Sequence, residues 1–279
     1  MTQKSSEGWP PKAYKNLDFL NSPEARKIRI LCELDETERR FKEENVEDTI
    51  VIFGSARTLP EKEAKARLKA VEEKLAGKKS LSAEDKDELA QARAAMRNAP
   101  YYHHVETLAR ELTRWSMSLQ DKRRRFLVCS GGGPGVMEAA NRGARKAGGA
   151  SIGLGISLPF EQSLNPYITR DLQFEFHYFF VRKYWFIYLA KALIVFPGGF
   201  GTMDELFETL TLIQTGKVQK RMPILLFGSE FWNRLLNFDA FLEWGVISPR
   251  DLDLFKIVDD PMEAKDYLIG ELTAQYLTH

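Results

Sequence analysis

The sequence has few of the features that mark secreted, metal-binding or membrane proteins. Only two of its 279 residues are cysteines, Cys32 and Cys129, and they show neither metal-ligand spacing nor a disulfide framework. Residues 1–7 lack the apolar core of a signal peptide. The most hydrophobic region, 174–197, is interrupted by basic residues, which argues against a membrane span. We therefore expect a soluble cytoplasmic protein.

The chain also lacks a charge excess. Its formal net charge is +1, so no overall field draws it to nucleic acid or to an anionic membrane. His103 and His104 have no metal-ligand partner at a useful spacing, and we expect no metal site. In contrast, 44% of the residues are hydrophobic, which suffices for a sizeable core.

From residue 100 onward, apolar β-rich runs alternate with helical patterns. Continuous apolar runs such as 192–196 indicate strands buried on both faces, which requires helices on both sides of a parallel sheet. The pattern predicts an α/β fold, a Rossmann-like doubly wound parallel sheet with ligands at the carboxyl ends of its strands. The expected strands are 49–53, 126–130, 151–156, 192–197, 223–228 and 254–258. The expected helices are 101–119, 135–148, 202–216, 230–244 and 261–273.

Two segments lie outside this alternation. Residues 1–48 are polar and helix-prone, and we interpret them as an N-terminal arm preceding a nucleotide-binding domain, 49–279. Within that domain, roughly half of the residues in 61–98 are charged, with Ala and Leu at helical intervals. We expect a helical hairpin there, with a turn at 77–82 and Ser82 as an N-cap.

Three predicted strand ends carry loops of small residues, at 54–57, 130–135 and 197–202, and the last two lead straight into helices. Glycine leaves backbone N–H groups accessible, and a helix N-terminus favours an anion, so phosphate suits this place. Tight turns alone would also account for one such loop. Val136 replaces the last glycine of G-x-G-x-x-G, and the chain has no G-x-x-x-x-G-K-[ST]. A nucleoside monophosphate therefore fits better than a dinucleotide or triphosphate.

Glu205 is the strongest candidate for chemistry. Thr202 and Glu205 also match a capping box, so a structural role is equally compatible with the local pattern. Glu208 lies one helical turn beyond. Carboxylates beside an anion site suit a centre that becomes cationic, as ribose C1′ does when an N-glycosidic bond breaks.

Arg182 and Lys183 form the other candidate pair. Basic residues between aromatic ones are often a helix surface, but here they precede the strand that leads into the 197–202 loop. An arginine offers a planar fork for phosphate or base, and a lysine offers a point charge.

With these residues in view, the chain resembles the Lonely Guy (LOG) family of cytokinin riboside 5′-monophosphate phosphoribohydrolases, long mislabelled as lysine decarboxylases. The likeness covers about 49–245 apart from the charged hairpin, and its signature is Arg182-Lys183 followed by Pro197-Gly198-Gly199-x-Gly201-Thr202-x-x-Glu205. It implies hydrolysis of a nucleoside 5′-monophosphate, such as AMP, to free base and ribose 5-phosphate by a homo-oligomer. No cofactor is implied, and no Ser-x-His-Lys type lysine for pyridoxal phosphate is present.

The resemblance also implies roles for individual residues. Arg182 and Glu205 would be catalytic. The residues implied or proposed to bind the substrate are Gly54, Ser55, Gly132, Gly133, Met137, Glu161, Lys183, Gly198, Gly199, Phe200, Gly201, Thr202, Met203, Asp204, Glu208 and Thr211. A non-catalytic binder or carrier of a nucleotide or phosphorylated cofactor is the alternative, because the glycine loops alone do not require Arg182 and Glu205.

Overall fold

The computed structural model describes residues 10, 12–119, 123–158 and 163–277. Within them the chain forms one seven-stranded sheet with all neighbouring strands parallel, in the order β4-β3-β2-β1-β5-β6-β7. The strands are β1 Thr49–Phe53, β2 Leu127–Ser130, β3 Ser151–Ile156, β4 Gln173–Phe176, β5 Ala190–Val195, β6 Ile224–Phe227 and β7 Phe255–Val258.

The α-helices of the described residues are α1 Leu17–Asn21, α2 Arg26–Glu43, α3 Glu61–Leu75, α4 Ala83–Ser118, α5 Val136–Lys146, α6 Phe179–Tyr188, α7 Phe200–Gln214, α8 Ser229–Leu235, α9 Phe238–Glu243 and α10 Pro261–Tyr276. The short 3-10 turns are η1 Ala13–Lys15, η2 Pro23–Ala25, η3 Arg170–Leu172 and η4 Pro249–Leu254.

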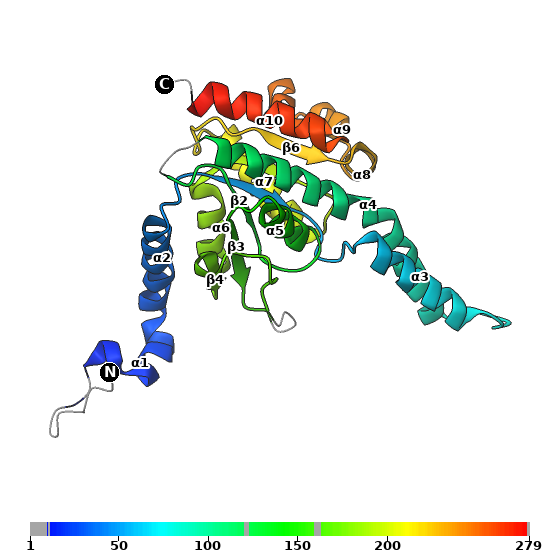
Figure 1. The fold of residues 1–279 in the computed structure, drawn as a ribbon, viewed down its shortest axis with the longest axis horizontal. Coiled ribbons are helices and arrows are strands. Elements are labelled where there is room, and N and C mark those ends of the chain that lie inside the picture. Colours follow the sequence, from blue (N-terminus) through cyan, green and yellow to red (C-terminus); the bar gives the residue numbers. More distant parts are fainter. Residues whose placement is uncertain (1–9, 11, 120–122, 159–162, 278–279) are drawn as a thin grey trace.

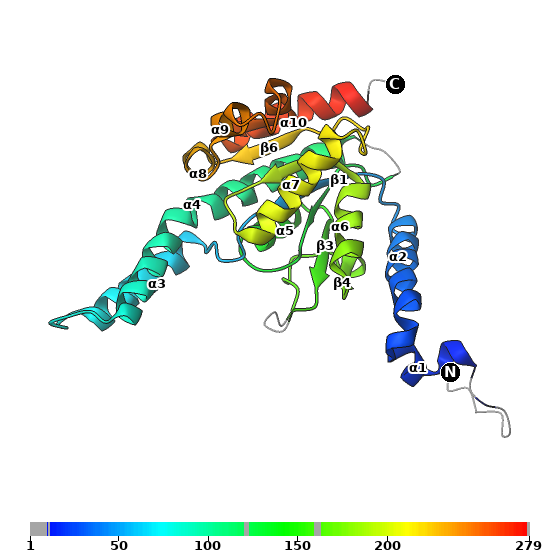
Figure 2. The same ribbon diagram turned by 180° about the vertical axis from the view of Figure 1, so that it is seen from behind.

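The sheet is covered on both faces, which confirms the predicted doubly wound fold (Figures 1 and 2). Strand β1 shows why. All five of its residues are buried; Ile50 and Ile52 pack into the core with α4, α5 and α10, whereas Val51 and Phe53 pack into the core with α2, α6 and α7. Because successive side chains of a strand point to opposite faces, a strand in the middle of this sheet must be apolar throughout.

The sheet contains a strand that the prediction missed. Strand β4 lies at the sheet edge, and its residues alternate, with Phe174 and Phe176 buried and Glu175 exposed. Such a half-buried alternation differs from the continuous apolar runs used to identify the other strands. The predicted helix 230–244 is likewise two helices, α8 and α9.

The charged hairpin is present, with Ser82 capping α4 through a capping box with Asp85. However, α4 does not begin near residue 100. It runs through Pro100, so that its first half packs on α3 through Ala92, Ala95 and Ala99, and its second half packs on the sheet. The predicted helix 101–119 would have placed His103 and His104 in its first turn; instead they lie in the interior of α4. A proline can lie inside a helix at the cost of one backbone hydrogen bond. Pro100 lies between Ala99, which packs with α3, and Tyr102, which packs with the body of the protein.

Helices α1 and α2 extend on the opposite side of the body from the hairpin (Figure 1). Phe41 of α2 contacts Phe174 and Trp185, which holds the end of the helix on the sheet layer. Among the described residues, no helix combines the length and apolar character needed to cross a membrane.

Candidate active site

A cavity of about 810 Å³, here called the central cavity, opens at the carboxyl ends of β1, β2, β3 and β5. The chain builds the sheet outward from β1 in one direction as far as β4 and resumes on its other side with β5, so β1 and β5 form the topological switch point where α/β proteins bind ligands. The lining residues are Phe53, Gly54, Ser55, Ala56, Arg57, Gly131, Met137, Ile156, Leu158, Phe179, Arg182, Phe186, Gly198, Gly199, Phe200, Gly201, Thr202, Met203, Glu205, Phe231 and Leu235.

Backbone hydrogen bonds join the loops at the cavity floor. The Ser55 N–H donates to the Pro197 carbonyl oxygen at 3.0 Å, and the Val136 N–H donates to the Ser55 carbonyl oxygen at 3.1 Å. The loop after β1 thus binds both the loop after β5 and the start of α5. The three glycine-containing segments found in the sequence form one connected surface.

Close packing of the loops requires glycine at two positions, 135 and 198. Gly135 has φ +71°, and a Cβ there would lie 2.4 Å from the Ser55 carbonyl oxygen. A Cβ on Gly198 would lie 2.1 Å from Oγ1 of Thr202. Neither position can accept a side chain without displacing the loop, so these glycines shape the floor of the site.

Two buried asparagines shape the loop after β2. The Asn165 amide donates to the carbonyl oxygens of Gly132 and Gly133 and to Oδ1 of Asn141, at 2.9–3.1 Å. Asn141 in turn accepts a hydrogen bond from the Ser130 hydroxyl at 2.8 Å. Gly132 and Gly133 do not line the central cavity. Their carbonyl groups instead accept the hydrogen bonds from Asn165.

Helix α7 begins earlier than the sequence suggested. Its N-cap is Gly199, so no side chain caps the helix, and Thr202 lies inside the first turn. The capping box between Thr202 and Glu205, one of the two alternatives that the local pattern allowed, does not form. Thr202, Glu205, Leu206 and Thr209 instead form the buried face of α7. With spacings of three and four residues, this pattern turns Glu205 inward.

Glu205 and Arg182 meet in the central cavity. Arg182 Nη2 lies 3.8 Å from Glu205 Oε1, and the two side chains are 15% and 5% exposed. Glu205 Oε2 is buried and has no hydrogen-bond partner among the described residues. The Arg182 guanidinium also lies over the rings of Phe179 and Phe186. A buried carboxylate oxygen without a partner is costly to a folded protein and is typical of a functional site.

Burial raises the pKa of Glu205 to about 7, although Arg182 and Lys183 act in the opposite direction. Desolvation disfavours the charged carboxylate, and the positive charges compensate for only part of that effect. Near neutral pH the group can therefore hold or release a proton, as a catalytic acid or base must.

Lys183, the neighbour of Arg182, is placed differently. Its Nζ lies 2.8 Å from Asp204 Oδ1 and 2.9 Å from Glu208 Oε2, linking α6 to the outer side of α7. None of these side chains lines the central cavity, and neither does Thr211, whose hydroxyl donates to the Phe207 carbonyl oxygen. Glu161 lies outside the described residues.

The central cavity thus brings together part of the predicted set: Gly54, Ser55, Met137, Arg182, Gly198, Gly199, Phe200, Gly201, Thr202, Met203 and Glu205. The sequence interpretation missed Arg57 and the apolar walls. Arg57 stands in a loop already singled out, so its position was available as a signal. Phe231 and Leu235 come from α8, and no local pattern marked them. Among the described residues, no group of three or more His, Cys, Asp or Glu side chains could hold a metal ion.

Comparison with known proteins gives partial matches to a family model and to curated relatives. Residues 137–268 match the family model described as "Possible lysine decarboxylase". A cytokinin riboside 5′-monophosphate phosphoribohydrolase of Arabidopsis thaliana is 44% identical over 62 residues, 22% of this chain and 28% of the relative. One from Mycobacterium tuberculosis is 28% identical over 143 residues, 50% of this chain and 73% of the relative. The chain thus spans little more than a quarter of the plant relative's length.

The solved structures that resemble the chain include a molybdenum cofactor carrier protein from Chlamydomonas reinhardtii. It is 17% identical with a TM-score of 0.44, and the match covers 81% of this chain and 99% of that one. A molybdenum cofactor binding protein from Rippkaea orientalis is 19% identical with a TM-score of 0.42, covering 62% and 88%. The motifs, the family model and the curated relatives together support the resemblance of this chain to the LOG family.

Proposed function

We propose that this protein hydrolyses the N-glycosidic bond of a nucleoside 5′-monophosphate, AMP or a cytokinin riboside 5′-monophosphate, to the free base and ribose 5-phosphate. The observation that carries the proposal is the buried Glu205, with an unpartnered carboxylate oxygen, facing Arg182 in the central cavity. The names of the curated relatives agree with this reaction.

The phosphate would bind at the start of α7. The first turn of a helix leaves backbone N–H groups without intrahelical partners and carries partial positive charge. Gly198, Gly199 and Gly201 allow close approach there, and all three line the cavity. Arg57, which has no ion-pair partner among the described residues, lines the same cavity and adds a positive charge there.

Glu205 lies one turn into α7, so a ribose anchored by its phosphate would place C1′ near this carboxylate. As the bond from C1′ to the base nitrogen breaks, its electron pair goes to the base and the sugar becomes cationic. The ionised Glu205 stabilises that cation and orients a water molecule toward C1′. The water oxygen bonds to C1′, and one of its protons goes to the departing base. The Arg182 guanidinium holds Glu205 in place and can donate to the base.

The test is direct. The purified protein is incubated separately with AMP and with an N6-prenylated AMP, and free base and ribose 5-phosphate are quantified by chromatography. We expect both products in equal amounts from at least one substrate. Tight binding of these nucleotides with no base release would leave the alternative, a non-catalytic nucleotide or phosphorylated-cofactor carrier.

We also propose that the protein acts in the cytoplasm as a homo-oligomer. Phe200 is 96% exposed at the cavity mouth, and Phe180, Tyr184 and Tyr188 are about half exposed along α6. Apolar side chains gathered in this way favour a subunit contact. Sedimentation velocity should show a species larger than the 32.0 kDa chain; a monomer at micromolar concentration would contradict this.

A further inference from the structure

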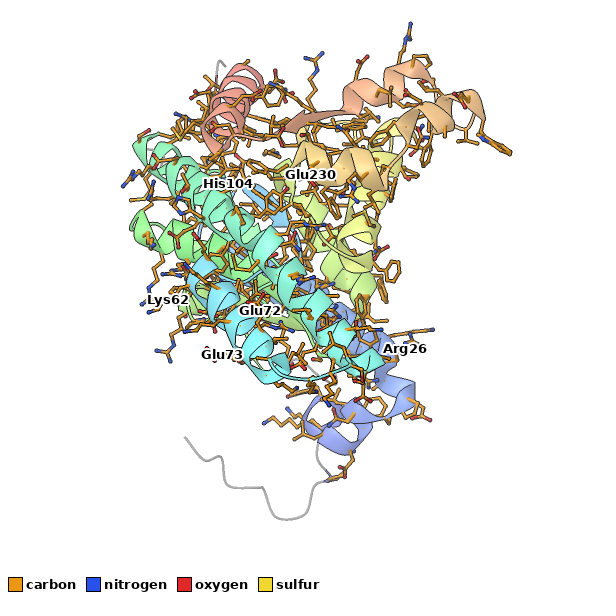
Figure 3. All side chains as sticks on the ribbon, turned by 90° about the vertical axis from the view of Figure 1, so that its right-hand side faces the viewer. Arg26, Lys62, Glu72, Glu73, His104 and Glu230 are labelled. Carbon is orange, nitrogen blue, oxygen red and sulfur yellow. The ribbon has the colours of Figure 1, made fainter. Side chains whose placement is uncertain are left out.

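A second cavity, of about 330 Å³, lies between α4 and α8, close to the point where the charged hairpin joins the body. We call it the α4–α8 cavity. Figure 3 looks onto this side of the molecule, with Glu230 of α8 and His104 of α4 labelled near each other. The lining residues are Arg97, Asn98 and Tyr101 of α4 and Glu230, Phe231, Arg234 and Leu235 of α8.

The wall formed by α4 is held firmly by the body. Arg97 and Tyr101 are four residues apart and share one face of the helix. The Tyr101 ring makes edge contacts with Phe196 and Phe227, at centroid distances of 6.4 and 6.3 Å. It also lies against Gly228, which has φ +98° and where a Cβ would be 2.7 Å from the tyrosine oxygen. The turn between β6 and α8 thus accommodates the tyrosine ring.

Two of the polar groups at this cavity, on Arg97 and Tyr101, have no partner among the described residues. Among the described residues, the Arg97 guanidinium takes part in no ion pair and the Tyr101 hydroxyl in no hydrogen bond. Arg234 and Glu230 form an ion pair, with 3.6 Å between Nη1 and Oε1, and both side chains are 72% exposed. Their charges therefore cancel. Among the lining residues this leaves one positive charge, that of the exposed Arg97. Outside the lining, the carboxylate of Asp259 also acts on Tyr101.

These groups define the chemistry of a ligand. A guanidinium presents a planar fork that matches carboxylate and phosphate oxygens, and a tyrosine hydroxyl can donate a further hydrogen bond. Burial, with the nearby charges of Glu230 and Asp259, raises the pKa of Tyr101, so the hydroxyl keeps its proton. Phe231, Leu235 and the Tyr101 ring offer apolar surface, and the volume lies at the lower end of the range of small-molecule sites.

We propose that the α4–α8 cavity binds a small organic anion that combines a planar ring with a carboxylate or phosphate group, with Arg97 and Tyr101 as its polar contacts. The site is separate from the central cavity but adjoins it. Phe231 and Leu235, one turn apart on α8, line both cavities. This inference does not depend on the proposed hydrolysis, because binding can be measured without turnover.

The experiment titrates the full-length protein with benzoate and with phenyl phosphate, which distinguish the two anionic groups, and with benzamide as the neutral control. Binding is followed by ligand-observed NMR. Arg97→Glu should weaken binding of the preferred anion by at least about tenfold, since a charge-assisted hydrogen bond is replaced by repulsion. Arg93→Glu, an exposed position one turn earlier on α4, is the matched control and should bind as the wild type does.

Two further variants make the assignment specific. Tyr101→Phe keeps the ring and should weaken binding by only a few-fold. Arg57→Glu changes the central cavity and should leave this binding event in place. Three results would overturn the proposal. They are equal affinity of the Arg97→Glu and Arg93→Glu proteins for the anion, wild-type affinity for benzamide equal to that for the anion, and no binding of either anion by the wild type at millimolar concentration.

Discussion

Two adjacent residues of α6, Arg182 and Lys183, both face acidic residues of α7, yet they form different kinds of ion pair. Lys183 bonds closely to Asp204 and Glu208 at the outer side of the helix pair, at 2.8 and 2.9 Å. Arg182 and Glu205 lie deeper, 3.8 Å apart. Among the described residues, Oε2 of Glu205 and Oε2 of Glu208 both lack a hydrogen bond of ordinary geometry, but the Glu208 oxygen lies 2.9 Å from Lys183 Nζ. The first group is suited to holding two helices together. In the second group, Glu205 keeps one buried carboxylate oxygen without a hydrogen bond among the described residues, as expected of a group that acts on a ligand.

The largest expected effect comes from Glu205→Gln. The amide keeps the shape but cannot stabilise a cationic sugar, so hydrolysis of AMP should fall by roughly a thousandfold, with nucleotide affinity retained. Initial rates and equilibrium binding measure the two quantities. Glu208→Gln, one turn along the same helix, is the matched control and should stay within roughly tenfold of the wild type. Similar losses in both variants would remove the distinction between the two ion pairs.

The next effect separates the two basic residues. Arg182→Ala should lower kcat/KM by roughly a hundredfold, since the guanidinium facing Glu205 is lost, and Arg182→Lys should recover little of it because a lysine lacks the planar fork. Lys183→Met should change kcat/KM far less and lower the free energy of unfolding by about 0.5–1 kcal/mol, a usual value for an ion pair near the surface. An inactive but stable Lys183→Met protein would contradict this ordering.

The smallest effect is a dependence of stability on pH. The folded-state pKa of Glu205, about 7, is raised above the ordinary value of 4.5, so the folded protein keeps a proton that the unfolded chain releases. This contribution is fully present below about pH 4.5 and is lost as the pH rises through 7. At pH 8, Glu205→Gln should therefore be more stable than the wild type, by about 1–2 kcal/mol.

Urea unfolding at pH 5 and pH 8 measures this difference, and Glu208→Gln serves as the control. A destabilised Glu205→Gln protein at pH 8 would show that the charged carboxylate stabilises the fold. In the same pH range the wild-type rate should rise as Glu205 ionises, because only the carboxylate can stabilise the cationic sugar.

The sequence predicted those parts of the fold that depend on neighbouring residues. Strand β1 and the loop after it, the hairpin turn with its Ser82 cap, and the glycine loop leading into α7 all follow from local rules of burial, capping and backbone freedom. Strand β4 was missed because only half of its residues are buried. The continuity of α4 through Pro100 was missed because a proline is locally a reason to end a helix.

By itself, the sequence determined the class of fold and the glycine loops at the strand ends, because glycine spacing and apolar runs act over a few residues. Only the tertiary structure decided which carboxylate of 204–208 enters the central cavity. The local pattern 202–205 fitted a helix cap equally well, and Gly199 took that position instead. Glu205 faces Arg182 across 23 positions of sequence. Helix α8 lines two cavities together with residues that are far from it in the chain. Such contacts depend on how helices pack on the sheet, which no local spacing encodes.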